Sequence, residues 1–235
     1  MPFMKNKRSG VETGESGFRE PRGIPDDPKK RARYREIIEA ALEAFSEYGY
    51  HDCPVSRIAR KAKVADGTIY LYFANKEEVL ISVFQEKINL MISEIEKQTR
   101  DCDNAWRKIE KLVRFHITVL GDNPVLANFF QIQLRQSSEK IRRGISGPLR
   151  SFYRLIESFV IEGQEEGIID AGINSNIARK VIFGSIDEVV SCWVRSRRRY
   201  DVKERIDDIL YILGRALLVN GARVCSPVVE RRLDS

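Results

Sequence analysis

The stretch at residues 55–76 constrains the fold of this chain more than any other part of the sequence. Its first apolar residues are spaced three and four positions apart, as on one buried face of a helix: Val55, Ile58, Ala59 and Ala62. Residues 63–65 break this period, and a second short helix is predicted over 66–72, with Ile69 and Phe73 facing inward. The pattern therefore predicts two helices joined by a tight turn, followed by the start of a third.

The second of these helices leaves a hydroxyl and aromatic rings on its outer face. The outward positions fall among Thr68, Tyr70, Leu71 and Tyr72. Such side chains suit the phosphate oxygens and thymine methyl groups of a DNA major groove. Packing in the core is the alternative for one of the two tyrosines. The stretch is therefore interpreted as a DNA-reading unit.

The distribution of charge agrees with this interpretation. The chain carries a net charge of +6, and residues 29–76 contain ten Lys and Arg against six Asp and Glu. Such a bias supplies attraction to DNA that is independent of sequence and makes binding depend on salt. The basic run from Lys29 to Arg35 opens the first predicted helix.

Three groups of residues resemble the amino-terminal domain of the TetR transcription regulators. They are Ile37-Ile38-x-Ala40-Ala41-x-x-x-Phe45, Tyr48-Gly49-Tyr50, and Gly67-Thr68-Ile69-Tyr70-Leu71-Tyr72-Phe73-x-Asn75-Lys76-Glu77. A pattern of this extent is far more specific than a short motif. One departure is visible, because the family usually has glycine where this chain has Lys63. Either Lys63 has a positive φ angle, or the turn differs locally.

The resemblance and the outward positions together give the candidate DNA-binding residues. The resemblance implies that Lys76 contacts a DNA phosphate, next to the backbone amides of a helix start capped by Asn75. It also implies that the arm at residues 29–35 touches DNA in or beside the minor groove, and a solvated arm is the alternative. The candidates are Ser56, Arg57, Asp66, Gly67, Thr68, Tyr70, Leu71, Tyr72 and Lys76.

Beyond Phe73 the sequence keeps the helical period, without the alternation typical of strands. Helices are predicted over 76–99, 104–120, 124–137, 147–166, 174–198 and 202–220, with Gly and Pro between them. The predicted fold is all-α, with an amino-terminal helix-turn-helix domain of three helices and a carboxy-terminal bundle for ligand binding and dimerisation. The predicted division is a flexible tail at 1–28, a DNA-binding domain at 29–76, the bundle at 77–221 and a flexible tail at 222–235.

The resemblance extends into the bundle, where the chain is similar to the FadR branch of the family. It rests on the run from Val64 to Phe73, on Leu134-Arg135-Gln136-Ser137, and on Ile182-Phe183-Gly184-Ser185-Ile186-Asp187-Glu188 followed by Trp193. This branch represses fatty-acid degradation and leaves DNA when long-chain acyl-CoA binds. The resemblance implies that effector, a palindromic operator and no cofactor. The alternative is a TetR-type repressor of an efflux or other operon that responds to a drug-like or lipid ligand.

An acyl chain needs an apolar tunnel, and the bundle is rich in large apolar side chains. Ordinary core packing is the alternative for each of them, since any helical bundle needs such residues. Arg135 is predicted to pair with Asp187 or Glu188, and competition of effector groups for that pair is the functional alternative. The candidate ligand residues are Phe115, Phe129, Phe130, Arg135, Phe152, Phe159, Phe183, Asp187 and Trp193.

The last two predicted helices carry apolar stripes that suit dimerisation. Gly184 and Gly214 allow close approach, so two chains would form a four-helix interface. A two-fold homodimer presents two recognition helices to palindromic double-stranded DNA. The candidate interface residues are Ile177, Val181, Gly184, Ile209, Leu213 and Leu217.

No feature of the sequence indicates an enzyme or a metal site. His51 and His116 lack an obvious catalytic partner, and the four cysteines lack C-x-x-C spacing. No signal peptide or apolar run of about eighteen residues is present, so we expect a cytoplasmic protein that does not contact membranes. An all-helical CoA-dependent enzyme and a DNA-organising protein insensitive to effectors are the alternatives from other classes.

Overall fold

The computed structural model describes residues 23–133, 139–197 and 200–219. In these residues the chain is helical, without a strand longer than one isolated bridge between Ile169 and Leu218, so the predicted all-α class is confirmed. The elements are α1 (Pro28–Tyr48), α2 (Val55–Lys61), α3 (Asp66–Tyr72), α4 (Lys76–Thr99), α5 (Ala105–Asp122), α6 (Pro124–Gln133), α7 (Glu139–Glu165), α8 (Ser175–Arg195), the 3-10 turn η1 (Val202–Arg205) and α9 (Ile206–Leu217).

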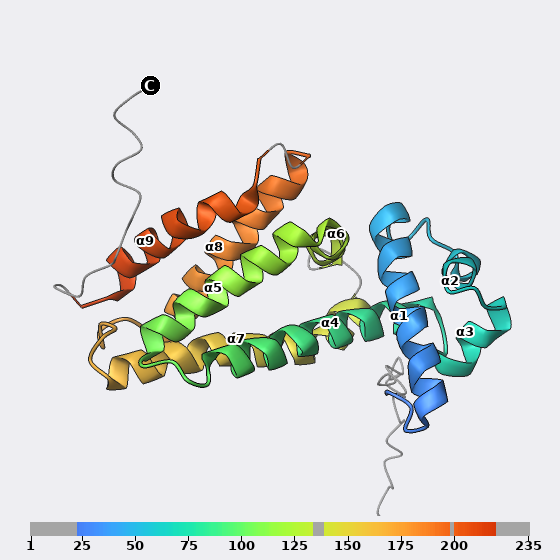
Figure 1. Ribbon diagram of the computed structural model, residues 1–235, viewed down its shortest axis with the longest axis horizontal. Helices are drawn as coiled ribbons and strands as arrows, with labels where there is room; N and C mark the ends of the chain where they lie inside the picture. The colour runs from blue at the N-terminus through green and yellow to red at the C-terminus, as the bar shows by residue number, and fades with distance from the viewer. Residues whose placement is uncertain (1–22, 134–138, 198–199, 220–235) are drawn as a thin grey trace, which may run out of the picture.

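Helices α1 to α3 form one end of the molecule, and α4 leads from them into the bundle (Figure 1). Helix α1 begins after Asp27, whose side chain accepts a hydrogen bond from the amide of Lys30 at 2.8 Å. Ile69 and Phe73 are buried as predicted, and the ring of Phe73 stacks on Tyr34 at 5.3 Å between centroids. These contacts hold the end of α3 against α1 and leave the opposite face of α3 exposed to solvent.

The turn between α2 and α3 contains Lys63 at φ 54°, so the first of the two predicted possibilities is correct. The amide of Val64 donates to the carbonyl of Ala59 at 3.0 Å, and that of Lys63 donates to Arg60 at 3.2 Å. This pair of bonds is the Schellman ending of a helix, which normally has glycine at the left-handed position. The lysine adopts the glycine conformation at a cost of about 1 kcal/mol or more.

Helix α4 has the bounds that the sequence predicts. Its start is capped by Asn75, whose side chain accepts from the amide of Glu78 at 2.8 Å. The helix packs on α1 at its beginning and on α5 and α7 further along. Helix α6 also lies against α1, so two elements of the bundle contact the end formed by α1 to α3.

Helix α7 differs from the prediction, because it begins at Glu139 and continues through Gly144, Gly147 and Pro148. A proline inside a helix leaves the carbonyl four residues earlier without its usual donor. Here that carbonyl is Gly144 O, and the side-chain amide of Gln85 in α4 donates to it at 3.2 Å. A Cβ at Gly144 would lie closer than 3.0 Å to three carbon atoms of Ile81. The two helices therefore meet in a contact that only glycine permits.

The other helix ends agree with the prediction to within a few residues. Helix α8 ends at Arg195 rather than 198, and the last segment opens with η1 before α9 and ends at Leu217 rather than 220. No helix in the described residues has an apolar stretch long enough to cross a membrane. The described residues also hold no group of three or more His, Cys, Asp or Glu side chains able to bind a metal ion.

Gly144→Ala should destabilise the fold, whereas Gly147→Ala should not. A methyl group at position 144 forces Ile81 to move, which lowers the free energy of unfolding by about 1–3 kcal/mol. A methyl group at Gly147 meets no atom within 4 Å and raises the helix propensity, which is worth about 0.5–1 kcal/mol. Urea unfolding of the two variants measures the difference. Equal stabilisation by both substitutions would contradict the close contact.

Candidate nucleic-acid interface and effector cavity

Helix α3 presents an exposed apolar and aromatic surface at its carboxy-terminal turn. Leu71 is 75% exposed and Tyr70 is 51% exposed. Thr68 and Tyr72 are partly buried, and the ring of Tyr72 lies 6.4 Å from Phe73. The two tyrosines therefore differ, since Tyr70 faces outward and Tyr72 packs partly against the core.

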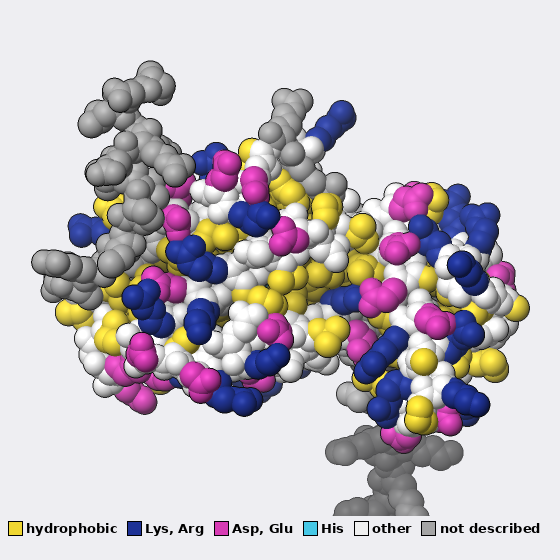
Figure 2. All heavy atoms as spheres, viewed as in Figure 1, with side chains coloured by type: hydrophobic (Ala, Val, Ile, Leu, Met, Phe, Trp, Pro, Cys, Tyr) yellow, Lys and Arg dark blue, Asp and Glu magenta, His cyan; other side chains and the backbone are white. Residues whose placement is uncertain are grey.

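The other candidate DNA residues lie on the same end of the molecule. Ser56 is exposed in the first turn of α2, and Asp66 and Gly67 are exposed at the start of α3. Arg57 is half-buried, with its guanidinium 4.0 Å from the centre of the Tyr48 ring. Figure 2 shows Lys and Arg side chains spread over this end, with acidic side chains among them.

Part of the positive charge is held by contacts within the protein. Lys61 pairs with Glu47 at 3.0 Å and with Glu43 at 3.5 Å, so its ammonium faces α1. Arg33 pairs with Glu36 at 2.5 Å. The excess of charge in residues 29–76 thus overstates the number of cations that project from the surface.

Lys76 joins α4 to the loop between α1 and α2. Its ammonium donates to the carbonyl oxygens of Tyr50 at 2.7 Å and His51 at 3.2 Å, and it lies 4.5 Å from the centre of the Tyr50 ring. An ammonium has three N–H donors, and these two bonds engage two of them. The observed role of Lys76 is to anchor the helix start, and its contact with a DNA phosphate stays a prediction.

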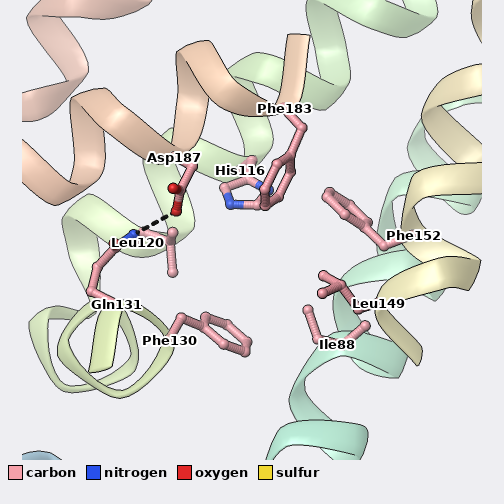
Figure 3. Close-up of a pocket in the computed structure, with 9 residues that line it drawn as sticks. All are labelled: Ile88, His116, Leu120, Phe130, Gln131, Leu149, Phe152, Phe183 and Asp187. Carbon is pink, nitrogen blue, oxygen red and sulfur yellow. Dashed lines mark hydrogen bonds between the residues drawn. The ribbon is translucent and has the colours of Figure 1, made fainter. Parts of the chain in front are cut away.

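A small cavity lies inside the bundle, between α4, α5, α6, α7 and α8 (Figure 3). Its volume is about 20 Å³. A cavity of this size holds about one water molecule, so it is far smaller than an acyl chain. The lining residues are Ile88, His116, Leu120, Phe130, Gln131, Leu149, Phe152, Phe183 and Asp187.

Four of the predicted ligand residues line this cavity: Phe130, Phe152, Phe183 and Asp187. Four others do not line it, and their contact with a ligand stays a prediction. Phe129 packs on Phe84, and the Trp193 indole donates to the carbonyl of Tyr200 at 2.8 Å. Phe115 is partly buried against the core, and the Lys108 ammonium lies 5.8 Å from the centre of the Phe159 ring.

Five lining residues are not among the predicted ligand residues, namely Ile88, His116, Leu120, Gln131 and Leu149. Ile88 is apolar and suits ordinary core packing equally well, and the sequence offers His116 only as a catalytic candidate that lacks a partner. The period of a helix indicates which residues are buried, but it does not separate a cavity wall from filled core. No signal in the sequence singles out Gln131.

The cavity has a polar wall made of side chains from three helices. Gln131 Nε2 of α6 donates to Asp187 Oδ1 of α8 at 3.2 Å, and the hydroxyl of Ser191 donates to Gln131 Oε1. Arg135, the predicted partner of Asp187 or Glu188, lies outside the described residues. Glu188 pairs with Arg195 at 2.7 Å.

His116 of α5 completes this wall and is held neutral by its surroundings. Burial lowers the pKa of the imidazole to about 4, because the loss of hydration disfavours its charged form. Its ring lies 5.4 Å from the Phe152 ring. At neutral pH the side chain therefore carries one N–H donor and one nitrogen acceptor.

An exposed apolar stripe runs along α8 and α9. Ile177, Val181, Tyr211 and Ile212 are exposed, and a Cβ at Gly184 would meet no atom within 4 Å. The three interface candidates of α9 lie elsewhere: Ile209, Leu213 and Leu217 are buried in the core of this chain. Their role in a dimer stays a prediction, and within one chain these side chains pack in the core.

Both parts of the chain match known families. The sequence pattern of the bacterial regulatory proteins of the tetR family matches residues 37–83, and that of the YsiA-like C-terminal region matches residues 84–216. The chain belongs to the TetR family. As a TetR-family chain it is a transcriptional regulator and not an enzyme.

Relatives of this TetR-family regulator include well-described proteins. It is 39% identical over 185 residues to the fatty acid metabolism regulator protein of Bacillus subtilis strain 168, covering 79% of this chain and 95% of that protein. FadR of Bacillus subtilis, solved in complex with stearoyl-CoA, superposes with a TM-score of 0.75 over 77% of this chain and 97% of that chain, at 39% identity. FadR of Bacillus halodurans has 38% identity and a TM-score of 0.75, over 81% and 100%. The resemblance to the FadR branch is thus confirmed.

Tyr70→Ala and Leu71→Ala should each weaken operator binding by this TetR-family regulator about tenfold or more without destabilising it. Both side chains are exposed, and a lost base or phosphate contact is worth about 1–3 kcal/mol. Leu90→Ala in α4, another exposed leucine, is the control. Fluorescence anisotropy with operator DNA, together with thermal unfolding, measures both properties. Unchanged DNA affinity in the α3 variants would contradict the assignment.

His116 should make stability depend on pH. The unfolded state has an ordinary histidine pKa of about 6.5, so it binds the proton before the folded state as the pH falls. The stability is full above that value and declines toward the folded pKa of about 4, by up to about 3 kcal/mol. His116→Phe should remove this contribution. Urea unfolding of both proteins over this pH range tests it, and parallel curves would contradict it.

Proposed function

We propose that the protein is a homodimeric repressor of fatty-acid degradation that leaves a palindromic operator when long-chain acyl-CoA binds. The observation that carries this proposal is the similarity to Bacillus subtilis FadR, which was solved with stearoyl-CoA and is covered almost completely by the match. The exposed face of α3 supports the DNA part, and the cavity in the bundle supports the effector part. Action on operator DNA implies a cytoplasmic location.

The small size of the cavity is the starting point of the proposed mechanism. An acyl chain cannot enter a volume of about 20 Å³, so Phe130, Leu149 and Phe183 have to move apart. Burial of each methylene contributes about 0.8 kcal/mol. A switch from 1:99 to 99:1 requires about 5.5 kcal/mol, which about seven buried methylenes supply. A long-chain effector therefore has enough binding energy to shift the equilibrium.

Two helices connect the cavity wall with the DNA-reading end, which is the end of the molecule formed by α1 to α3. Ile88 of α4 lines the cavity, and the same helix begins at Lys76, which binds the carbonyl oxygens of Tyr50 and His51. Phe130 and Gln131 of α6 line the cavity, and α6 packs on α1. Lys87 of α4 also pairs with Glu39 of α1 at 2.5 Å. Opening the cavity would thus tilt α1 to α3.

The exposed stripe of α8 and α9 is the proposed dimer interface. Ile177, Val181 and Gly184 follow one another at helical spacing, and Tyr211 and Ile212 of α9 are exposed beside α8. Two copies would form a four-helix interface around a two-fold axis. Such a dimer presents two α3 helices to major grooves about 34–36 Å apart or at another helical repeat.

The proposed division of the chain follows the same roles. Residues 29–76 would read DNA, and residues 77–221 would bind the effector and the second chain. The proposed boundary falls inside the first turn of α4, whose helix runs on without interruption. A continuous helix across the boundary suits a protein in which one part has to move the other.

Stearoyl-CoA should release the protein from the DNA upstream of its own gene, and stearate should not. Fluorescence anisotropy of labelled DNA, titrated with each compound, measures the release. Tyr70→Ala should keep its affinity for stearoyl-CoA while losing DNA, because the two sites lie in different parts of the chain.

Other outcomes of this titration separate the alternatives. Release by a cationic drug but not by stearoyl-CoA would support a repressor of an efflux operon. Tight, salt-dependent DNA binding that no acyl compound disturbs would contradict the proposed effector while retaining the DNA-binding role.

Val181→Glu should prevent dimerisation, and Ile161→Glu should not. The two side chains are equally exposed, at 43% and 42%, but Ile161 lies on α7, outside the proposed interface. A carboxylate buried between two chains without a partner is costly, so the first variant should be a monomer that binds a palindrome weakly. Light scattering after size-exclusion chromatography measures the mass. Dimers in both variants would contradict the proposed interface.

A further inference from the structure

His116 is a buried polar residue in an otherwise mostly apolar part of the bundle. The side chain is 7% exposed, and its Nδ1 atom has no hydrogen-bond partner among the described residues. Leaving a buried nitrogen unpaired is unfavourable, and native structures contain few such atoms. An apolar side chain at this position would avoid that penalty. The His116 side chain therefore needs a hydrogen-bond partner that the described residues do not provide.

The place of His116 in the cavity indicates where such a partner would come from. Figure 3 shows His116, Gln131 and Asp187 toward one side of the cavity, and Ile88, Leu149 and Phe152 toward the other. The orientation of the Gln131 amide follows from its bonds, because Oε1 accepts from Ser191 and Nε2 donates to Asp187. The cavity thus has a polar wall facing an apolar wall, and it suits a molecule with one polar group next to a hydrocarbon chain.

The chemistry of the polar wall restricts that group further. No lysine or arginine is among the described lining residues, and burial keeps His116 uncharged at neutral pH. An ionised carboxylate or phosphate in such a place would be costly. A neutral oxygen is different, because it accepts a hydrogen bond from a neutral imidazole. Nδ1 has almost no accessible surface in this structure, so side chains around it have to move before the oxygen of a ligand reaches it.

We propose that His116 Nδ1 donates a hydrogen bond to the carbonyl oxygen of the effector's thioester, with the first methylenes of the acyl chain against Ile88, Leu149 and Phe152. The inference rests on the proposed function, which supplies the class of ligand. It adds the residue that distinguishes an acyl thioester from other molecules with the same chain. The free acid lacks a neutral oxygen at neutral pH, and a simple alkyl chain lacks an oxygen altogether.

The test compares two ligands that differ in one carbonyl group. Stearoyl-CoA has the carbonyl, and S-octadecyl-CoA, the thioether of the same chain length, has a methylene in its place. Isothermal titration calorimetry should give the wild type about tenfold higher affinity for the thioester, because a buried donor is otherwise left without its acceptor. His116→Phe, which keeps a ring against Phe152, should bind the two ligands equally. His116→Asn, whose amide nitrogen lies near the place of Nδ1, should restore part of the preference.

Each outcome decides the inference. Equal affinity of the wild type for the two ligands would overturn it and leave the proposed function standing. The same preference in the wild type and in His116→Phe would also overturn it, because the carbonyl would then be recognised elsewhere. Failure of both ligands to bind the wild type would overturn the proposed function together with the inference. Should His116→Phe fail to fold, the wild-type ratio and His116→Asn decide alone.

Discussion

Helix α4 is fixed at its start and again at the turns that meet α7. Lys76 bonds the carbonyl oxygens of Tyr50 and His51 at one end, and further along Gln85 bonds Gly144 O while Ile81 fills the space above Gly144. Between and beyond these contacts the helix has no break. Packed helices resist bending and move as units. In the proposed mechanism, α4 would therefore carry a displacement of the cavity wall at Ile88 to the end formed by α1 to α3.

Gly144 and Pro148 of α7 both contribute to the contact with α4. Pro148 removes a donor from α7, and the carbonyl that loses it is satisfied from α4. The missing Cβ of Gly144 brings the two helices close enough for that bond to form. Lys140 of α7 pairs with Glu77 in the first turn of α4 at 2.8 Å, on the same side. The start of α7 is thus attached to the start of α4, close to the residues that are proposed to face DNA.

Local sequence patterns predict much of the structure around α3 and α4. The bounds of α3 and α4, the cap at Asn75 and the inward side chains of Ile69 and Phe73 follow from periodicity and capping within a few residues. At Lys63 the sequence left two possibilities open, and the structure shows the positive φ angle. The family resemblance at residues 37–77 led to the correct fold, and its extension into the bundle led to the FadR branch.

The features that escaped prediction depend on residues distant in the chain. Gly144, Gly147 and Pro148 look like the end of a helix, and only contacts from α4 explain why α7 continues through them. Ile209, Leu213 and Leu217 carry the apolar period of α9, but that period does not tell core from interface. The cavity wall likewise requires five helices to be placed in space before Gln131 and His116 can be recognised as part of it.

The proposed mechanism requires that the DNA-binding site and the effector site are coupled. The most direct test measures the affinity for stearoyl-CoA with and without saturating operator DNA. If one equilibrium of α4 governs both sites, operator DNA must lower that affinity by the same factor by which stearoyl-CoA lowers the affinity for the operator. Equal factors, measured by calorimetry and anisotropy under one salt condition, are the predicted result. An affinity for stearoyl-CoA that operator DNA leaves unchanged would contradict the account.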